Sequence, residues 1–198
     1  MINIMLLTDK TYYTTEEYLE LEINSQEKHE YIKGEIVAMT GGTPNHNKIA
    51  LNLAGALNFM VRSQPYQVFI ADQRLWIPEQ KIYTYPDVMV IHGNLQFQEG
   101  RKDTVTNPLI IAEVLSKSTK NYDLVDKFTA YRTIPTLQEY ILIDQYSFSV
   151  QHYRKTNDNE WLFSEYQGEN SLLSLNSVVF EITLKDIYAK VDFSAENI

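Results

Sequence analysis

Two acidic side chains in this chain of 198 residues fall in segments that are otherwise apolar. Asp87 begins the run 87–91, and Glu113 lies within the run 109–115. A carboxylate in such a segment is costly to bury unless a positive group binds it. Both runs are short, rich in β-branched residues and bounded by turn residues, which is typical of central strands. If the two strands lie side by side, their carboxylates form a hard-oxygen site suited to Mg²⁺, and also to Mn²⁺.

This set of groups matches the requirements of phosphodiester hydrolysis. The reaction needs a positioned water, a way to deprotonate it and positive charge on the transition state, and one or two Mg²⁺ ions supply most of this. Asp87 and Glu113 are the candidate metal ligands, with the backbone carbonyl of Val114 as a further one. Lys127 on the next helix is the candidate for orienting the water or stabilising negative charge. Glu30, or as a second choice Glu35, can add a carboxylate from an N-terminal hairpin.

Each of these residues also has a purely structural explanation. Asp87 can be a turn residue at the start of a strand, and Glu113 can belong to a structural salt bridge. Lys127 follows Asp123 by four residues, and an exposed helical pair of this kind contributes about 0.3–0.5 kcal/mol. Glu30 can be a solvated hairpin residue. Residue type and spacing alone leave both interpretations open.

His46 is expected in the first turn of a helix that begins near Thr43 and Pro44. A helix N-terminus can bind phosphate, so an imidazole there is a candidate for contact with substrate. The alternative is a helix-start histidine that hydrogen-bonds a loop carbonyl. The other three histidines are scattered without ligand spacing, so a zinc site is not predicted. Tyrosines in predicted loops and strand edges can stack on bases or pack at a protein surface.

The elements that position these groups can be predicted from periodicity and turn residues. Thr14 and Glu17 form a capping-box pattern that opens a helix to about residue 24, and Lys33-Gly34 marks the turn of a hairpin over 29–39. Further helices are predicted over 43–63, 119–133 and 184–191, strands over 67–77, 87–91, 109–115, 138–143 and 176–182, a hairpin over 147–166, and an irregular loop over 92–108. This order predicts an α/β or α+β domain, a mixed β-sheet flanked by helices with peripheral β-hairpins.

Length, composition and charge narrow the class of protein. The chain is expected to form a single domain over 1–198, with its core at about 12–191. It has no apolar run of the roughly 20 residues that span a membrane, and its first residues do not form a secretory signal. Without cysteine it has no disulfide, which fits a cytoplasmic protein. The net charge of −9 is the wrong sign for holding nucleic acid by bulk electrostatics.

The charge is distributed unevenly along the chain. Residues 1–35 hold eight acids against three lysines, whereas residues 101–132 hold six basic residues against four acids. The small basic excess therefore surrounds the candidate site. A polyanion can bind at this site, through a contact that is weak or depends on metal.

Several motifs, in this order, resemble those of the bacterial family of putative restriction endonucleases, a branch of the PD-(D/E)XK nuclease superfamily. They are Pro86-Asp87, Glu113-Val114-Leu115-Ser116, the stretch 122–128 with Tyr131, and the stretch 138–144, together with 30–35 and Asn45-His46. The resemblance extends over about residues 12–188. It implies a restriction-endonuclease-like core, a mixed sheet flanked by helices with a metal site at one edge.

The chain departs from the superfamily pattern at one position. The superfamily places a lysine two residues after the acid, where this chain has Leu115. Members of this family draw the lysine from the following helix, which points to Lys127. Lys117 is nearer in sequence but is expected in a loop, so it is taken as a candidate substrate contact.

These arguments lead to one principal hypothesis and one alternative. The principal hypothesis is a Mg²⁺-dependent endonuclease that hydrolyses DNA phosphodiester bonds with a metal-activated water. We expect a homodimer, because each protomer offers one site and cleavage of a duplex needs two. The alternative is a non-catalytic nucleic-acid-binding or assembly module that keeps the nuclease fold. A nuclease of RNA or of single strands shares the same chemistry and differs in groove shape.

Overall fold

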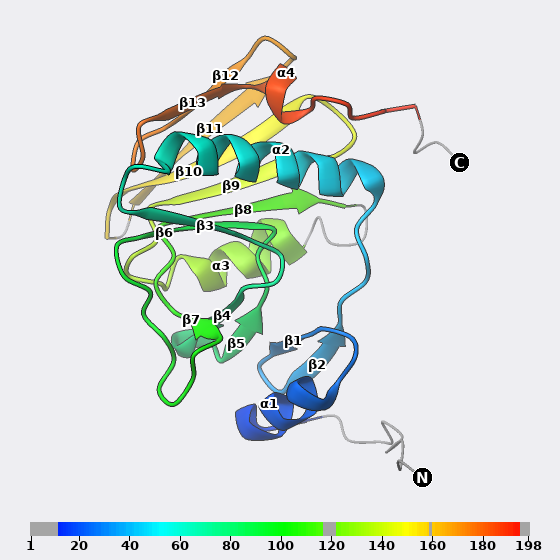
Figure 1. Ribbon diagram of the computed structural model, residues 1–198, viewed down its shortest axis with the longest axis vertical. Coiled ribbons are helices and arrows are strands. Elements are labelled where there is room, and N and C mark those ends of the chain that lie inside the picture. Colours follow the sequence, from blue (N-terminus) through cyan, green and yellow to red (C-terminus); the bar gives the residue numbers. More distant parts are fainter. Residues whose placement is uncertain (1–11, 117–121, 159, 195–198) are drawn as a thin grey trace.

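A six-stranded mixed sheet forms the centre of the computed structural model, which describes residues 12–116, 122–158 and 160–194 (Figure 1). The strand order is β11-β10-β9-β8-β6-β3. The strands are β3 (Tyr66–Ile70), β6 (Val88–His92), β8 (Ile110–Leu115), β9 (Glu139–Asp144), β10 (Ser149–Asn157) and β11 (Glu160–Gln167). Neighbours are antiparallel except β8 and β9, which run parallel. A parallel pair needs a crossover, and the helical segment between these two strands supplies it.

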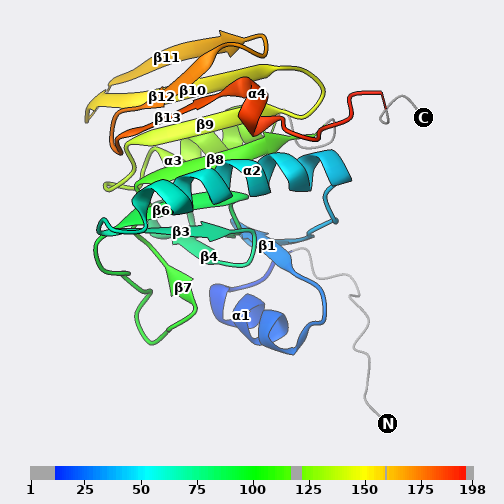
Figure 2. The same ribbon diagram turned by 45° about the horizontal axis from the view of Figure 1, so that its top comes forward.

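One face of this sheet is covered by helix α2 (Pro44–Val61) and by the C-terminal elements, as Figure 2 shows. These elements are the hairpin β12 (Leu172–Leu175) and β13 (Phe180–Thr183) and the short helix α4 (Leu184–Ile187). Ile49, Leu53 and Leu57 recur at helical spacing and are buried against the sheet. The larger of the two main apolar clusters therefore lies between α2 and the strands.

The opposite face carries the π-helical segment η2 (Tyr122–Lys127), helix α3 (Phe128–Tyr131) and part of a second sheet. This five-stranded sheet has the order β2-β1-β5-β4-β7. Its strands are β1 (His29–Ile32), β2 (Glu35–Ala38), β4 (Arg74–Ile77), β5 (Ile82–Thr84) and β7 (Thr104–Val105), with a 3₁₀ turn η1 (Pro78–Gln80) between β4 and β5. The apolar cluster on this face joins the two sheets through residues such as Leu75, Met89 and Tyr131.

The N-terminal helix α1 (Thr15–Asn24) is attached to the five-stranded sheet by tyrosines. Tyr18, Tyr31 and Tyr83 are buried together, with ring centroids 5.0–6.0 Å apart. Trp76 stacks on Tyr83 at 4.1 Å. Aromatic contacts at these distances add to the stabilisation from burial. This cluster fixes strand β1, and with it Glu30, in front of the main sheet.

Most of the predicted elements are confirmed, and four predictions are wrong. The capping box at Thr14, the first hairpin, the long helix and the three central strands are found as expected. The predicted strand 67–77 is two strands, β3 and β4, which belong to different sheets and are separated by a turn at 71–73. The predicted loop 92–108 contains β7, and the predicted strand 176–182 begins only at Phe180. The predicted helix 184–191 ends at Ile187.

The helix expected over 119–133 is confirmed over residues 122–131, where its backbone differs in type from the α-helix that was expected. Residues 117–121 lie outside the described part, and the helical backbone that follows is π-helical up to Lys127 before a single α-helical turn. Strands β5 and β12 were not predicted because each is three or four residues long. In the described part of the chain, no helix is long and apolar enough to cross a membrane.

Candidate active site

Asp87 and Glu113 lie directly across from each other on neighbouring strands. Strand β6 pairs antiparallel with β8 so that Val88 is opposite Ala112, and continuing this register by one residue brings Asp87 opposite Glu113. The backbone N–H of Asp87 donates to Glu113 Oε2 at 3.3 Å, and the backbone N–H of Val114 donates to Asp87 Oδ2 at 2.8 Å. The two acids singled out in the sequence therefore meet at one edge of the sheet, each bound to the backbone of the other strand.

Glu113 is buried, with 3% of its surface exposed. Its Oε1 accepts a hydrogen bond from the phenol of Tyr131 at 2.6 Å and contacts the ammonium of Lys127 at 3.2 Å. Tyr131 follows Lys127 by four residues, a spacing that places both side chains on one side of a helix. The helical crossover between β8 and β9 thus supplies both donors.

Lys127 also reaches the third carboxylate of the site. Its Nζ lies 3.5 Å from Glu30 Oε1, an oxygen that also accepts a hydrogen bond from the hydroxyl of Thr84. The side chains of Lys127 and Glu30 are only 13% and 11% exposed. Glu30 comes from β1 of the five-stranded sheet and Glu113 from β8 of the main sheet. One ammonium therefore bridges two carboxylates that belong to different layers.

His46 enters the site from the opposite face of the main sheet. It lies in the first turn of α2, whose N-cap Thr43 accepts the backbone N–H of His46 at 3.1 Å. Its Nε2 is 3.1 Å from Asp87 Oδ2. The imidazole also lies close to Gly42, where an added Cβ would be 2.8 Å from Nδ1. The glycine is thus what allows the ring to reach Asp87.

These contacts change the acidity of two groups in the site. Burial alone would raise the pKa of Asp87, but the hydrogen bond and charge of His46, the Val114 N–H and the Lys127 ammonium lower this pKa below its ordinary value. Burial, together with the charge of Glu113, raises the pKa of Tyr131 well above 10. Asp87 is consequently a carboxylate at neutral pH, and Tyr131 is a neutral phenol that donates its proton in a hydrogen bond.

The structure brings five of the predicted site residues together and leaves one undescribed. Asp87, Glu113, Lys127, Glu30 and His46 form one connected cluster, and Val114 contributes its backbone beside them. Lys117 lies outside the described residues, as does the side chain of Asp123, the alternative partner of Lys127.

Two contacts of the cluster were not predicted from the sequence. No polar role was predicted for Tyr131, and Thr84 lies in a strand that was not predicted. The spacing of four between Lys127 and Tyr131 is the signal that points to the first contact.

The donor chemistry of the cluster fits Mg²⁺. In the described residues, no three His, Asp or Glu side chains are grouped as a ready metal cage. Mg²⁺ does not require such a cage, because it usually keeps several waters and binds through one or two carboxylates. Asp87 and Glu113 provide that pair. Lys127 lies 3.2 Å from Glu113 and brings positive charge, and His46 Nε2 lies 3.1 Å from Asp87. The predicted ligand set is thus chemically adequate for a partly hydrated ion.

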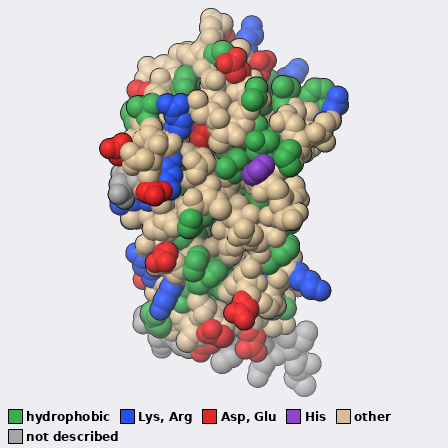
Figure 3. All heavy atoms as spheres, turned by 90° about the vertical axis from the view of Figure 1, so that its left-hand side faces the viewer, with side chains coloured by type: hydrophobic (Ala, Val, Ile, Leu, Met, Phe, Trp, Pro, Cys, Tyr) green, Lys and Arg blue, Asp and Glu red, His purple; other side chains and the backbone are tan. Residues whose placement is uncertain are grey.

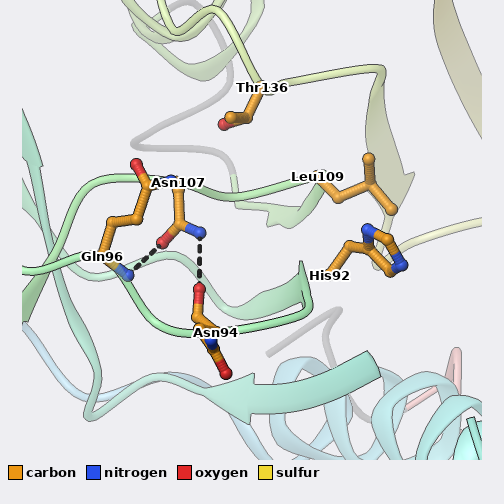
Figure 4. A pocket seen from close by; sticks show the side chains of 6 residues that line it. All are labelled: His92, Asn94, Gln96, Asn107, Leu109 and Thr136. Atoms are coloured by element: carbon orange, nitrogen blue, oxygen red, sulfur yellow. Dashed lines mark hydrogen bonds between the residues drawn. The ribbon is translucent and has the colours of Figure 1, made fainter. Parts of the chain in front are cut away.

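A separate hollow of about 320 Å³ lies at the other end of the central strands. It is lined by His92, Asn94, Gln96, Asn107, Leu109 and Thr136 (Figure 4). Five residues of strand, or about 17 Å, separate His92 from Asp87. The side-chain oxygen of Asn107 accepts a hydrogen bond from the backbone N–H of Gln96 at 2.8 Å. Its NH₂ group donates to the backbone carbonyl of Asn94 at 3.0 Å. Its amide therefore closes a loop, and the hollow is not part of the carboxylate cluster.

One face of the molecule, the left-hand side of Figure 1, carries basic and acidic side chains together. On the face in Figure 3, the coloured Lys and Arg side chains are interspersed with Asp and Glu side chains. This mixture agrees with the net charge of −9. Bulk charge on this face therefore gives little attraction for a polyanion.

The arrangement described above defines a fold of the restriction-endonuclease type, with an acidic cluster at the edge of its mixed sheet. A solved structure described as a putative nuclease belonging to DUF820, from Anabaena variabilis, superposes with a TM-score of 0.73. The match covers 89% of this chain and 98% of that chain at 19% identity, so it shows the shared fold.

The chain belongs to the family described as "Uma2: Putative restriction endonuclease", whose model matches residues 15–185. Two relatives in Synechocystis are known as uncharacterized proteins sll1609 and slr1290. The first is 45% identical over 85% of this chain and 95% of its own length, and the second is 35% identical over 90% and 92%. Family and fold together support a nuclease-type function with nucleic acid as the class of substrate.

Proposed function

We propose that this protein is a metal-dependent endonuclease that hydrolyses phosphodiester bonds of DNA. The observation that carries the proposal is the convergence of Asp87 and Glu113 on adjacent strands, with Lys127 bound to Glu113 and Glu30. Three carboxylates and one ammonium in a nearly buried cluster are an expensive arrangement for a purely structural purpose. A divalent cation would interact with the carboxylates, and a phosphodiester would interact with the ammonium.

Asp87 and Glu113 would hold the metal, with the backbone carbonyl of Val114 as a further ligand. The metal, Mg²⁺ or Mn²⁺, supplies Lewis acidity and an acidified water when it is bound. Lys127 would orient the attacking water and stabilise negative charge on the phosphoryl oxygens. Glu30 would act as an accessory acid that holds Lys127 in place, since its Oε1 lies 3.5 Å from Nζ. His46 and Lys117 are proposed as contacts to the substrate.

DNA as substrate and a homodimer as the working form are parts of the same proposal. A single site cuts one strand, so cleavage of a duplex calls for two copies. The net charge of −9 makes the metal itself the principal attraction for phosphate. We therefore expect binding of DNA to depend more on the divalent cation than is usual for a basic nuclease.

The net charge of −9 favours a second, non-catalytic function. An acidic protein whose site carboxylates already have cationic and hydrogen-bonding partners can serve as a non-catalytic nucleic-acid-binding or assembly module. In that case the cluster would hold the two sheets together. The two functions differ in metal binding, because only the endonuclease needs the ion.

The test combines calorimetry of Mn²⁺ and Mg²⁺ binding with cleavage of supercoiled plasmid. We expect the wild type to bind Mn²⁺ and nick the plasmid, Asp87→Asn to lose both activities, and Lys127→Ala to lose cleavage. Lys155→Ala is a matched control, because Lys155 is 12% exposed and pairs with Asp158 at 3.3 Å on a distant hairpin. Metal binding that Asp87→Asn leaves unchanged would contradict the proposal and favour the non-catalytic module.

A further inference from the structure

One oxygen of the buried glutamate receives two donors of very different character. Glu113 Oε1 accepts from the phenol of Tyr131 at 2.6 Å and from the ammonium of Lys127 at 3.2 Å. The phenol is attached to a rigid ring, whereas the ammonium ends a flexible stem that is also within 3.5 Å of Glu30. The shorter and better-fixed contact is the one from the tyrosine.

We propose that Tyr131 is a positioning residue that orients Glu113 as a metal ligand and leaves Lys127 available for the substrate. This inference rests on the proposed function, since it assigns a role within the same site. The Tyr131 hydroxyl holds Oε1 and thereby sets the rotation of the carboxylate toward the ion. Lys127 can then move to a water or a phosphoryl oxygen while Oε1 keeps a donor.

The surroundings of the ring support this role. Tyr131 is fully buried in the cluster between the two sheets, and its ring packs edge-on against Tyr140 at 5.3 Å. Tyr140 belongs to β9, the strand parallel to β8, in the register that places it beside Ile111. The phenol is therefore fixed by the same sheet that carries Glu113. Hydrogen-bond partners of a metal ligand that are held in this way tune metal affinity.

A packing role alone makes a different prediction. The ring of Tyr131 fills the core in either case, and a phenylalanine would fill it equally well. Only the positioning role assigns a consequence for metal binding to the hydroxyl. Tyr131→Phe separates the two, because it keeps the ring and removes the donor to Glu113 Oε1.

The experiment measures Mn²⁺ affinity by calorimetry and single-turnover cleavage for the wild type, Tyr131→Phe and Tyr66→Phe. Tyr131→Phe is expected to bind Mn²⁺ about 10-fold to 100-fold more weakly. Its cleavage rate at saturating metal should also fall, because Lys127 then stays paired with Glu113 and is not available for the substrate. Tyr66→Phe is the matched control, since it removes a hydroxyl that donates to the Ser177 carbonyl at 3.2 Å, far from the site. It should leave Mn²⁺ affinity unchanged.

A second variant keeps the inference testable if Tyr131→Phe does not fold. In Lys127→Met, Tyr131 still orients Glu113 and a repelling positive charge is gone, so Mn²⁺ affinity should be unchanged or tighter while cleavage is lost. Loss of metal affinity in Lys127→Met, or wild-type affinity in Tyr131→Phe, would overturn the role of Tyr131. If Asp87→Asn binds Mn²⁺ as the wild type does, the metal site itself is wrong and both proposals fall.

Discussion

Glu113 and Glu139 are both buried glutamates in adjacent parallel strands, yet their surroundings differ in kind. Glu113 lies on the α3 side of the sheet, where its donors include the side chains of Lys127 and Tyr131. Glu139, on the α2 side, accepts the backbone N–H groups of Asn176 and Ser177 at 3.0 and 2.7 Å. His152 Nε2 lies 2.6 Å from its other oxygen.

This difference separates a site from a structural anchor. Backbone N–H groups in a turn cannot be withdrawn without unfolding that turn, so the carboxylate of Glu139 is permanently engaged. The Lys127 and Tyr131 side chains can exchange partners when a ligand arrives. Asp87 and Glu30 lie beside Glu113 and add negative charge, which favours a cation. Burial of an acid marks both places, whereas the type of donor tells them apart.

The largest expected effect is the loss of activity in Glu113→Gln. The amide keeps the shape and an acceptor for Tyr131 but removes the charge that would bind metal, so plasmid cleavage should fall about 10³-fold. The free energy of unfolding should change by about 1 kcal/mol or less, because one member of an acidic cluster is neutralised. Cleavage assays and urea denaturation measure the two quantities. A variant that is strongly destabilised yet fully active would make Glu113 an anchor like Glu139.

Glu139→Gln should show the reverse pattern. The NH₂ group of the new glutamine cannot accept the hydrogen bonds that Glu139 accepts from His152, Ser177 or Asn176. The free energy of unfolding should therefore fall by about 3 kcal/mol. Cleavage per folded molecule should remain at the wild-type level. Glu181→Gln on strand β13 is the control, because that carboxylate is exposed and accepts from Ser174 at 3.2 Å. Equal stability of the two variants in urea would mean that Glu139 is not a structural anchor.

A smaller effect is expected from Gly42→Ala. The new methyl group would lie 2.8 Å from Nδ1 and 3.1 Å from Cγ of His46, so the ring must move away from Asp87. Loss of this partner of a metal ligand should weaken Mn²⁺ binding about 10-fold. Gly41→Ala is the neighbouring control, because a Cβ there meets nothing within 4 Å. Calorimetry on both variants therefore isolates the contact between His46 and Asp87.

The smallest effect concerns pH. Burial alone would raise the pKa of Glu139, but hydrogen bonds from His152 and Ser177 lower it below its ordinary 4.5. The folded pKa is below the unfolded one, so the resulting stabilisation is present above pH 4.5 and is lost as pH falls through the folded value. The difference in unfolding free energy between wild type and Glu139→Gln should therefore shrink between pH 6 and pH 3. A difference that stays constant over this range would mean that the charge of Glu139 does not matter.

Periodicity and turn chemistry predicted much of the fold, and they failed where tertiary pairing determines strand ends. The helix from Pro44 and the strands around Asp87 and Glu113 follow from apolar patterns that extend over several residues. The split of 67–77 into two strands follows from their pairing with β6 and β5 in different sheets. Strands of two or three residues, such as β5 and β7, have too little sequence to carry a pattern.

The sequence by itself indicated that Asp87 and Glu113 lie on apolar central strands, where a carboxylate is costly to bury without a partner. It also pointed to Lys127 as the missing cation. Only the tertiary structure decided that Glu30 shares this lysine, that His46 crosses from the other face to Asp87, and that Tyr131 shares Glu113 with Lys127. These contacts join residues from separate helices and sheets. Local sequence encodes the cost of burying a charge, whereas the identity of its partners depends on how distant elements pack.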